Sequence, residues 1–149
     1  MDAPSVSTST YSRYILAGIG GDNQRVIAFP DAFVSSILVI DRANILPVPF
    51  YDAAIAGLLP HQGRVMPIVV LRRALGEQGA LLPETFPVVH LSSWAGGLEG
   101  VGLVVNEVLE SVPADHYQPQ ANHLSIDSIL DQLPLELWQP RRWQSRTAV

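Results

Sequence analysis

The sequence predicts a mainly β domain in which short strands form small barrels and a helix follows near the C-terminus. Short apolar runs alternate with clusters of Gly, Pro, Asp and Asn, which is the pattern of strands joined by tight turns. One segment, residues 125–133, instead shows apolar residues at helical spacing. With 149 residues, of which 48% are hydrophobic and 15% charged, the chain is long enough for one domain with a buried core.

The first elements form a predicted β hairpin. Residues 11–19 are rich in β-forming side chains, residues 20–24 form a Gly/Asp/Asn turn, and residues 25–30 resume an extended pattern. Residues 31–40 fit either one helical turn or the entry to a strand. Residues 45–50 contain two prolines, which predict a position at a sheet edge or outside a sheet.

The middle of the chain predicts a helix, a turn and a strand. Residues 52–59 are small, with apolar residues at helical spacing, and predict a short helix. Residues 60–63 predict a tight turn in which Gly63 has a positive φ. Residues 64–71 are extended, but Pro67 has no N–H to donate, so the strand must leave that position unpaired or bulged. Such a proline is tolerable if the strand crosses between two small sheets instead of lying centrally in one large sheet.

The C-terminal half continues this pattern. Residues 74–83 predict a loop with room for a helical turn, residues 86–91 a strand, residues 94–100 a hairpin tip, and residues 101–112 one further strand. Residues 114–123 have no regular pattern.

Residues 125–133 give the clearest helix. Ser125 is suited to the N-cap, and Pro134 ends the helix. The apolar stripe consists of Ile126, Ile129, Leu130 and Leu133.

Charge is distributed unevenly along the chain. Through Arg73 there are six Arg and five Asp, whereas from Ala74 to Pro140 there are nine acidic residues and no base. The acidic half and a sequence pI near 5.2 argue against nucleic-acid binding, which requires a basic surface. The three tail arginines predict a solvated basic tail (141–149), with contact to a phosphate or an acidic partner as the alternative.

The composition and the N-terminal residues also indicate where in the cell the protein is expected. The chain has no cysteine, so disulfides and thiolate metal sites are excluded. The first ten residues are small and polar, which predicts a disordered tail (1–10) and no signal peptide. No apolar stretch approaches the roughly 20 residues of a membrane span, so we expect a cytoplasmic protein without direct membrane insertion.

No group of residues predicts a catalytic or metal site, and no cofactor is expected. His116 and His123 lie near Asp115, where a surface metal site is the alternative to ordinary surface histidines. His90 ends a strand pattern and is interpreted as a half-buried packing residue. Glu107 and Glu110 are three residues apart, which on a regular strand predicts opposite faces.

Three sequence pieces, in order, resemble one known family. They are Val34-Ser-Ser-Ile37, then Ile45-Leu-Pro-x-Pro49 with Gly57 and the run Gly63-Arg-Val-Met-Pro67-Ile-Val-Val-Leu71-Arg72, then Gly102-Leu-Val-Val-Asn-Glu-Val108. Together they resemble the CheW-like family, the adaptors that couple chemoreceptors to a CheA-type histidine kinase. The resemblance runs from about Arg13 to Val112.

The resemblance implies a CheW-like domain over residues 11–140 and no catalysis. It implies two intertwined five-stranded, SH3-like barrels that share a core, with a C-terminal helix and with the chain passing from the first barrel to the second at the strand of Pro67. Only a short segment separates Pro113 from Ser125, where family members have another hairpin. The second barrel is therefore expected to be incomplete, which would leave a strand edge through which the chain could form a homo-oligomer.

The resemblance also places partner-binding residues. The receptor tip is expected between the barrels, near Val34, Ile37, Gly57 and Gly63, and the kinase's regulatory domain is expected to pack barrel against barrel. The full predicted partner-binding set is Val34, Ser36, Ile37, Gly57, His61, Gln62, Gly63, Val65 and Met66.

Three positions depart from the family pattern by losing a charge. Ser36 and Asn106 stand where acidic residues are common, and Gln62 stands where the family has arginine. The leading hypothesis is an adaptor in chemotaxis or in pilus- or light-directed motility. The alternatives are a divergent scaffold that self-associates or binds another signalling partner, and a small-molecule-binding or enzymatic domain.

Overall fold

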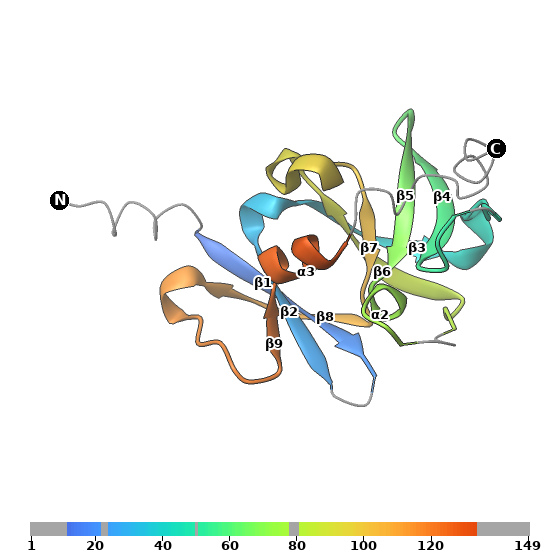
Figure 1. The fold of residues 1–149 in the computed structure, drawn as a ribbon. Coiled ribbons are helices and arrows are strands. Elements are labelled where there is room, and N and C mark those ends of the chain that lie inside the picture. The colour runs from blue at the N-terminus through green and yellow to red at the C-terminus, as the bar shows by residue number, and fades with distance from the viewer. Residues whose placement is uncertain (1–11, 22–23, 50, 78–80, 134–149) are drawn as a thin grey trace, which may run out of the picture.

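The protein folds as two β-sheets with a short C-terminal helix between them (Figure 1). The structure, a computed structural model, describes residues 12–21, 24–49, 51–77 and 81–133. The four-stranded sheet has the order β8-β1-β2-β9, and the five-stranded sheet has the order β3-β6-β7-β5-β4. Their strands are β1 (Arg13–Gly20), β2 (Arg25–Pro30), β3 (Val34–Asp41), β4 (Ile55–His61), β5 (Arg64–Val70), β6 (Thr85–Leu91), β7 (Gly102–Val104), β8 (Glu107–Pro113) and β9 (His123–Ser125).

The two sheets are nested along the chain. β3 to β7, the middle of the chain, make the five-stranded sheet, whereas the four-stranded sheet combines the first two strands with the last two. The chain leaves the four-stranded sheet through a 3-10 turn, η1 (Asp31–Phe33), and returns to it after β7. The predicted β1–β2 hairpin is confirmed.

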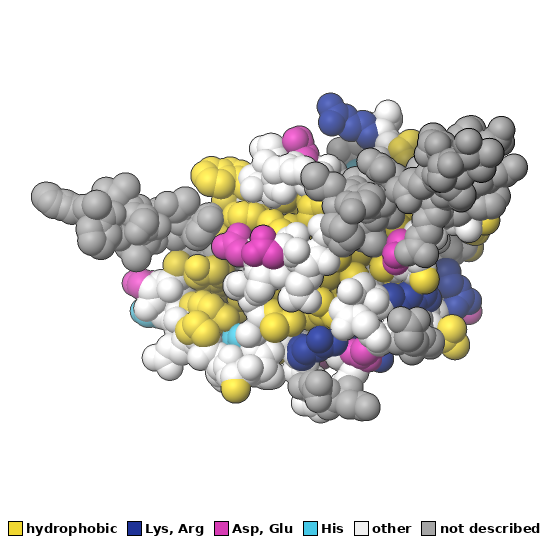
Figure 2. Space-filling view, viewed as in Figure 1, with side chains coloured by type: hydrophobic (Ala, Val, Ile, Leu, Met, Phe, Trp, Pro, Cys, Tyr) yellow, Lys and Arg dark blue, Asp and Glu magenta, His cyan; other side chains and the backbone are white. Residues whose placement is uncertain are grey.

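The main hydrophobic core lies between the sheets and includes the helix α3 (Ile126–Gln132). Ser125 caps this helix by accepting a hydrogen bond from Ser128 N, and Ile126 and Ile129 are fully buried, as the stripe predicts. A second cluster fills the other face of the five-stranded sheet, with Met66, Ile68 and Phe86 at its centre. Figure 2 shows hydrophobic side chains across the middle of the face seen in Figure 1.

The helix predicted over residues 52–59 is wrong, because this region contains β4. Buried and partly exposed residues alternate along β4, with Ile55, Gly57 and Leu59 on the buried side. The small residues of this segment fit both the helical spacing and the two-residue alternation of a strand. Antiparallel pairing with β5 favours the strand. The only short helix nearby in the described chain is α2 (Leu71–Ala74), which begins where β5 ends.

The strand predicted over residues 101–112 divides into β7 and β8, which belong to different sheets. Val105 N bonds to Pro87 O of β6, and Asn106 N bonds to Gly18 O of β1, so the chain changes sheets between these two residues. The change cannot be read from the apolar run, because both strands are apolar on their core side.

The prediction of two five-stranded barrels is corrected: the described strands form open sheets, one of four strands and one of five. The crossing predicted at Pro67 is also wrong, since β5 lies entirely within the five-stranded sheet. β5 pairs with β7 only from Ile68 onward, and Pro67 lies one residue before that pairing begins. The missing N–H of Pro67 therefore lies just beyond the end of the hydrogen-bonded pairing between β5 and β7, where no bond is lost.

A bulge in β8 corrects the prediction for Glu107 and Glu110. Glu110 lies opposite Leu16 and Glu107 opposite Gly18, with Leu109 as the extra residue. Leu16 and Gly18 are two residues apart on β1 and share a face, so both carboxylates lie on that same face.

Candidate functional site

The five-stranded sheet has a wide pocket at one end, here called the mouth pocket. Four of the predicted partner-binding residues line it: His61, Gln62, Val65 and Met66. The remaining lining residues are Ser35, Arg64, Pro67, His90, Leu91, Ser92, Ser93, Glu99 and Gly100, and the volume is ≈ 760 Å³.

The β4–β5 hairpin forms one side of the mouth pocket. Its two loop residues, Gln62 and Gly63, have φ values of 51° and 76°, which a two-residue hairpin turn of the I′ type requires. The prediction of a positive φ at Gly63 is confirmed, and Gln62 shares that conformation. The turn directs His61 and Arg64, which are paired across it, toward the pocket.

A polar group of three side chains lies at the mouth pocket. Ser36 Oγ is 3.4 Å from His90 Nδ1, and the His90 and His61 rings are in edge-to-face contact with centroids 5.6 Å apart. Burial, followed by the charge of His61, holds the pKa of His90 below its usual value. His90 is therefore neutral at neutral pH, and its interaction with Ser36 is a hydrogen bond between uncharged groups.

Apolar side chains of β3 and β8 make a second surface, here called the intersheet margin and defined as the half-buried Val34 and the exposed Ile37, Val39 and Val108. Ile37 pairs with Val89 and Val39 with Pro87, on the face that the five-stranded sheet turns toward the other sheet. Val108 pairs with the buried Ala17, on the corresponding face of β8. The exposed fractions of Ile37, Val39 and Val108 are 41%, 75% and 39%.

Gly57 has a packing role and does not line the mouth pocket. It is buried in β4 with φ 153°, and a Cβ built there would clash with Leu46 O. Leu46 forms an isolated antiparallel bridge to Leu58, so the segment before β4 lies directly on the strand at this glycine. Its requirement for glycine is steric.

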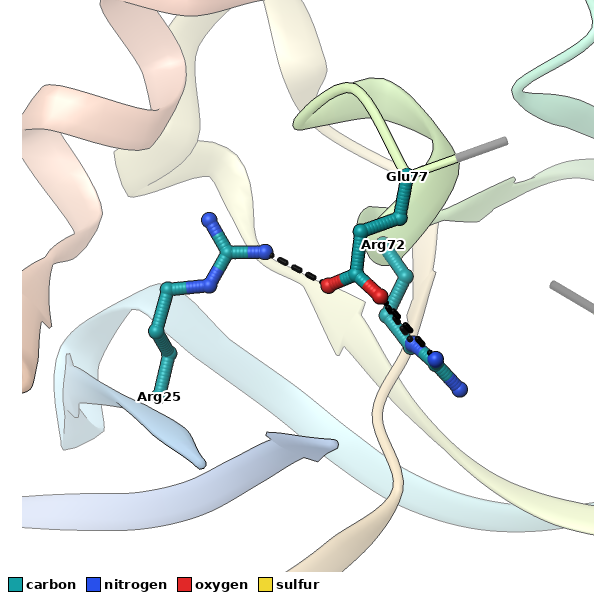
Figure 3. Close-up of polar contacts among 3 residues, drawn as sticks. All are labelled: Arg25, Arg72 and Glu77. Carbon is teal, nitrogen blue, oxygen red and sulfur yellow. Dashed lines mark hydrogen bonds and ion pairs between the residues drawn. The ribbon is translucent and has the colours of Figure 1, made fainter. Parts of the chain in front are cut away.

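The two sheets are also joined by an ion triad (Figure 3). The carboxylate of Glu77, which follows α2, lies between Arg72 at 3.0 Å and Arg25 of β2 at 2.8 Å. Hydrogen bonding to Arg72 is the largest cause that lowers the pKa of Glu77, and Arg25 adds to it. The triad fixes the β1–β2 hairpin against the end of β5.

The described residues contain no group of three or more His, Cys, Asp or Glu side chains placed to bind a metal. Within the same part of the chain no helix has the length and apolar character needed to cross a membrane. Of the two histidines considered for a surface metal site, His123 has its Nδ1 2.9 Å from Tyr117 Oη, within hydrogen-bonding distance. His90 is half-buried, as predicted.

Four residues of the predicted partner-binding set line the mouth pocket, whereas other residues of the two surfaces were not in that set. Ser36 reaches the mouth pocket only through His90, while Val34 and Ile37 lie on the intersheet margin. The residues missed are His90, Val39 and Val108. Strand alternation from Ile37 would have found Val39, but the contact of His90 with Ser36 and His61 depends on pairing between distant strands.

Comparison with known proteins bears on the family and the fold of the chain. A family model described as CheW-like domain matches residues 13–132. Among solved structures, the scaffolding protein TtCheW from Thermoanaerobacter tengcongensis matches with a TM-score of 0.55 and 15% identity, over 70% of this chain and 66% of that one. The match thus spans slightly less than two thirds of the relative. A comparison with curated protein sequences finds no match.

Proposed function

Because the chain belongs to the CheW-like domain family, whose members are non-enzymatic scaffolds, we propose that it couples a chemoreceptor tip to a CheA-type histidine kinase. The mechanism is positional, since the domain holds two partners in fixed geometry through apolar patches with polar rims. The proposal includes a cytoplasmic location and a role in chemotaxis or in pilus- or light-directed motility.

The observation that carries the proposal is the exposure of Ile37, Val39 and Val108 along the intersheet margin. Large apolar side chains grouped at a surface indicate a protein contact. We assign this margin to the receptor tip. Burial of apolar surface there would supply about 25 cal/mol per Å² removed from water.

The mouth pocket is the second partner surface, which we assign to the kinase's regulatory domain. Val65 lines this pocket and is 60% exposed, so the pocket offers an apolar anchor. Trp94 follows the lining residue Ser93 on η3 (Ser93–Leu98) and is 57% exposed. Ser36 and Gln62 contribute neutral hydrogen-bonding groups where the family pattern has charges. We therefore expect ionic strength to act on this contact only through Arg64 and Glu99, the charged residues that also line the pocket.

The test replaces Ile37 and Val39 together with serine and measures binding to the receptor tip and to the kinase regulatory domain. Loss of two exposed apolar anchors predicts receptor binding about tenfold weaker or more, with kinase binding unchanged. Leu81→Ser is the matched control, because Leu81 is 85% exposed but lies outside the margin.

Unchanged receptor binding in the double variant would contradict the assignment of the margin. Absence of binding to either partner at micromolar concentration, with the wild-type protein folded, would contradict the proposed function itself. The two outcomes are separated because the second is observed without any substitution.

A further inference from the structure

Strand β8 leaves one edge of the four-stranded sheet open. Among the described residues it pairs with β1 only, so the backbone groups on its other side have no strand partner. An open edge is a template for another extended segment. The question is which segment has the chemistry to bind there.

The face of β8 that points away from the core combines two carboxylates with apolar side chains. The bulge places Glu107, Leu109 and Glu110 on this face, where Glu107 Cγ and Leu109 Cδ1 lie 3.5 and 4.0 Å from the Cβ position of Gly18. Leu109 is 46% exposed. A cavity of ≈ 270 Å³ adjoins it, lined by Leu16, Val26, Leu109, Glu110, Val112, His116, Tyr117, Gln118, Gln120 and His123. The surface therefore fits an apolar side chain next to positive charge.

No described arginine supplies that charge. Arg13 bonds to Ser111, Arg25 and Arg72 to Glu77, Arg42 to Leu82 O and Arg73 to Ala53 O. Arg64 lines the mouth pocket, in the other sheet. Arg25 and Arg72 both form ion pairs with the carboxylate of Glu77.

The chain itself carries a complementary segment beyond its last described residue. Residues 138–143 read WQPRRW, so two tryptophans flank two arginines, and Arg146 follows. Arginine binds carboxylates through two parallel hydrogen bonds, and tryptophan is a frequent anchor in apolar pockets. The N-terminal ten residues contain no base and cannot take this role.

The length of this segment is sufficient. Leu133 packs in the core beside β2 and β9, and β8 is two strands from β2. Two strand spacings amount to about 10 Å, and passing around the sheet edge adds a similar distance. The eight residues from Leu133 to Arg141 span at most about 29 Å when extended.

We infer that residues 138–143 dock along β8 of the same chain, with a tryptophan in the cavity beside Leu109 and the arginines on Glu107 and Glu110. Attachment to the same chain gives the segment an effective concentration on the order of millimolar, which favours binding within one molecule over binding between molecules. This inference is independent of the proposed adaptor function.

The absence of cysteine makes a crosslinking test direct, because two introduced thiols are the only ones present. The full chain with Leu109→Cys and Gln144→Cys is treated with a short thiol crosslinker. We expect an intramolecular crosslink, seen as a chain of monomer mass with altered mobility. The control pair is Leu46→Cys and Gln144→Cys, since Leu46 is 58% exposed and lies near β4 in the other sheet.

Charge variants test the recognition. Glu107→Gln with Glu110→Gln is expected to slow the crosslinking of the Leu109 pair about fivefold, as does raised ionic strength, because two exposed ion pairs are lost. Glu84→Gln with Asp41→Asn is the matched control and leaves the rate unchanged, because both side chains are exposed and lie away from β8. Equal crosslinking of the two cysteine pairs, crosslinks of dimer mass, or a rate insensitive to Glu107 and Glu110 would each overturn the inference.

Discussion

His90 lies at the mouth pocket between two different neighbours. On one side Ser36 Oγ is within hydrogen-bonding distance, and on the other the His61 ring meets it edge to face. A protonated His90 would lose solvation and would lie close to a second titrating ring, so the neutral form is favoured. The serine at position 36 is compatible with this neutral ring.

Replacing His61 with glutamine tests the origin of the His90 pKa. Because burial is the larger cause and remains, we expect the pKa of His90 to rise toward, but not reach, the ordinary value of 6.5. An NMR titration of the His90 ring measures the change. His116→Gln is the control, since His116 is exposed on η4 (Ala114–His116), and a His90 pKa that does not respond to His61→Gln would show that burial alone lowers it.

At the scale of the element, β4 depends on one glycine more than on its apolar content. Gly57 combines a φ that other residues rarely adopt with contact to the backbone of Leu46. The register between β4 and β5 shifts at this residue, between Ile55 and Gly57. The strand bends there, which brings the preceding segment onto it.

Gly57→Ala is therefore expected to lower the free energy of unfolding by roughly 2–4 kcal/mol, through backbone strain together with the clash at Leu46 O. Urea denaturation followed by circular dichroism measures the loss. Gly63→Ala is the matched control: it also has a positive φ, 76°, but opens into empty space, so its cost is about 1 kcal/mol. Equal losses for the two variants would rule out the steric contribution.

Single elements were predictable where a local pattern is unambiguous. Ser125, with an apolar stripe and Pro134 after it, predicts α3, and the Gly/Asp/Asn cluster predicts the β1–β2 turn. The bulge at Leu109 was not predictable, because it arises from pairing with a strand about a hundred residues away. If the bulge is not known, the regular alternation of side chains along a strand places Glu107 and Glu110 on opposite faces.

At the scale of the whole molecule, the resemblance predicted the family and the two-part β architecture, while closure of the parts was overestimated. The three motif pieces lie in β3, in β4 and β5, and in β7 and β8. They therefore describe the five-stranded sheet more fully than the four-stranded one. Which strands complete the second sheet depends on β9 pairing parallel with β2, a contact for which the sequence gives no local signal.

The Glu77 triad acts at this scale because it joins the two sheets (Figure 3). Glu77→Gln is expected to reduce stability at pH 7. The folded pKa of Glu77 lies below the unfolded value near 4.5, so its contribution is present above that value and is lost as the pH falls through the folded pKa.

The difference in unfolding midpoint between wild type and Glu77→Gln should thus be largest near neutral pH and disappear under acidic conditions, as measured by thermal denaturation across pH. Glu84→Gln is the control, because the Glu84 side chain is exposed and the ion pairs of Arg25 and Arg72 are made with Glu77. A midpoint difference that stays unchanged into strongly acidic conditions would show that the ionised carboxylate of Glu77 is not its source.

The nested strand order has a consequence for how the protein forms during translation. Arg13 and Ser111, neighbours across β1 and β8, are 98 residues apart in sequence. The hairpin at the start of the chain must remain without its outer strand until nearly the whole inner sheet has been synthesised, and late, distant pairing of this kind slows folding. A nascent chain stalled before β8 would present the unpaired side of β1 to chaperones and to other nascent chains.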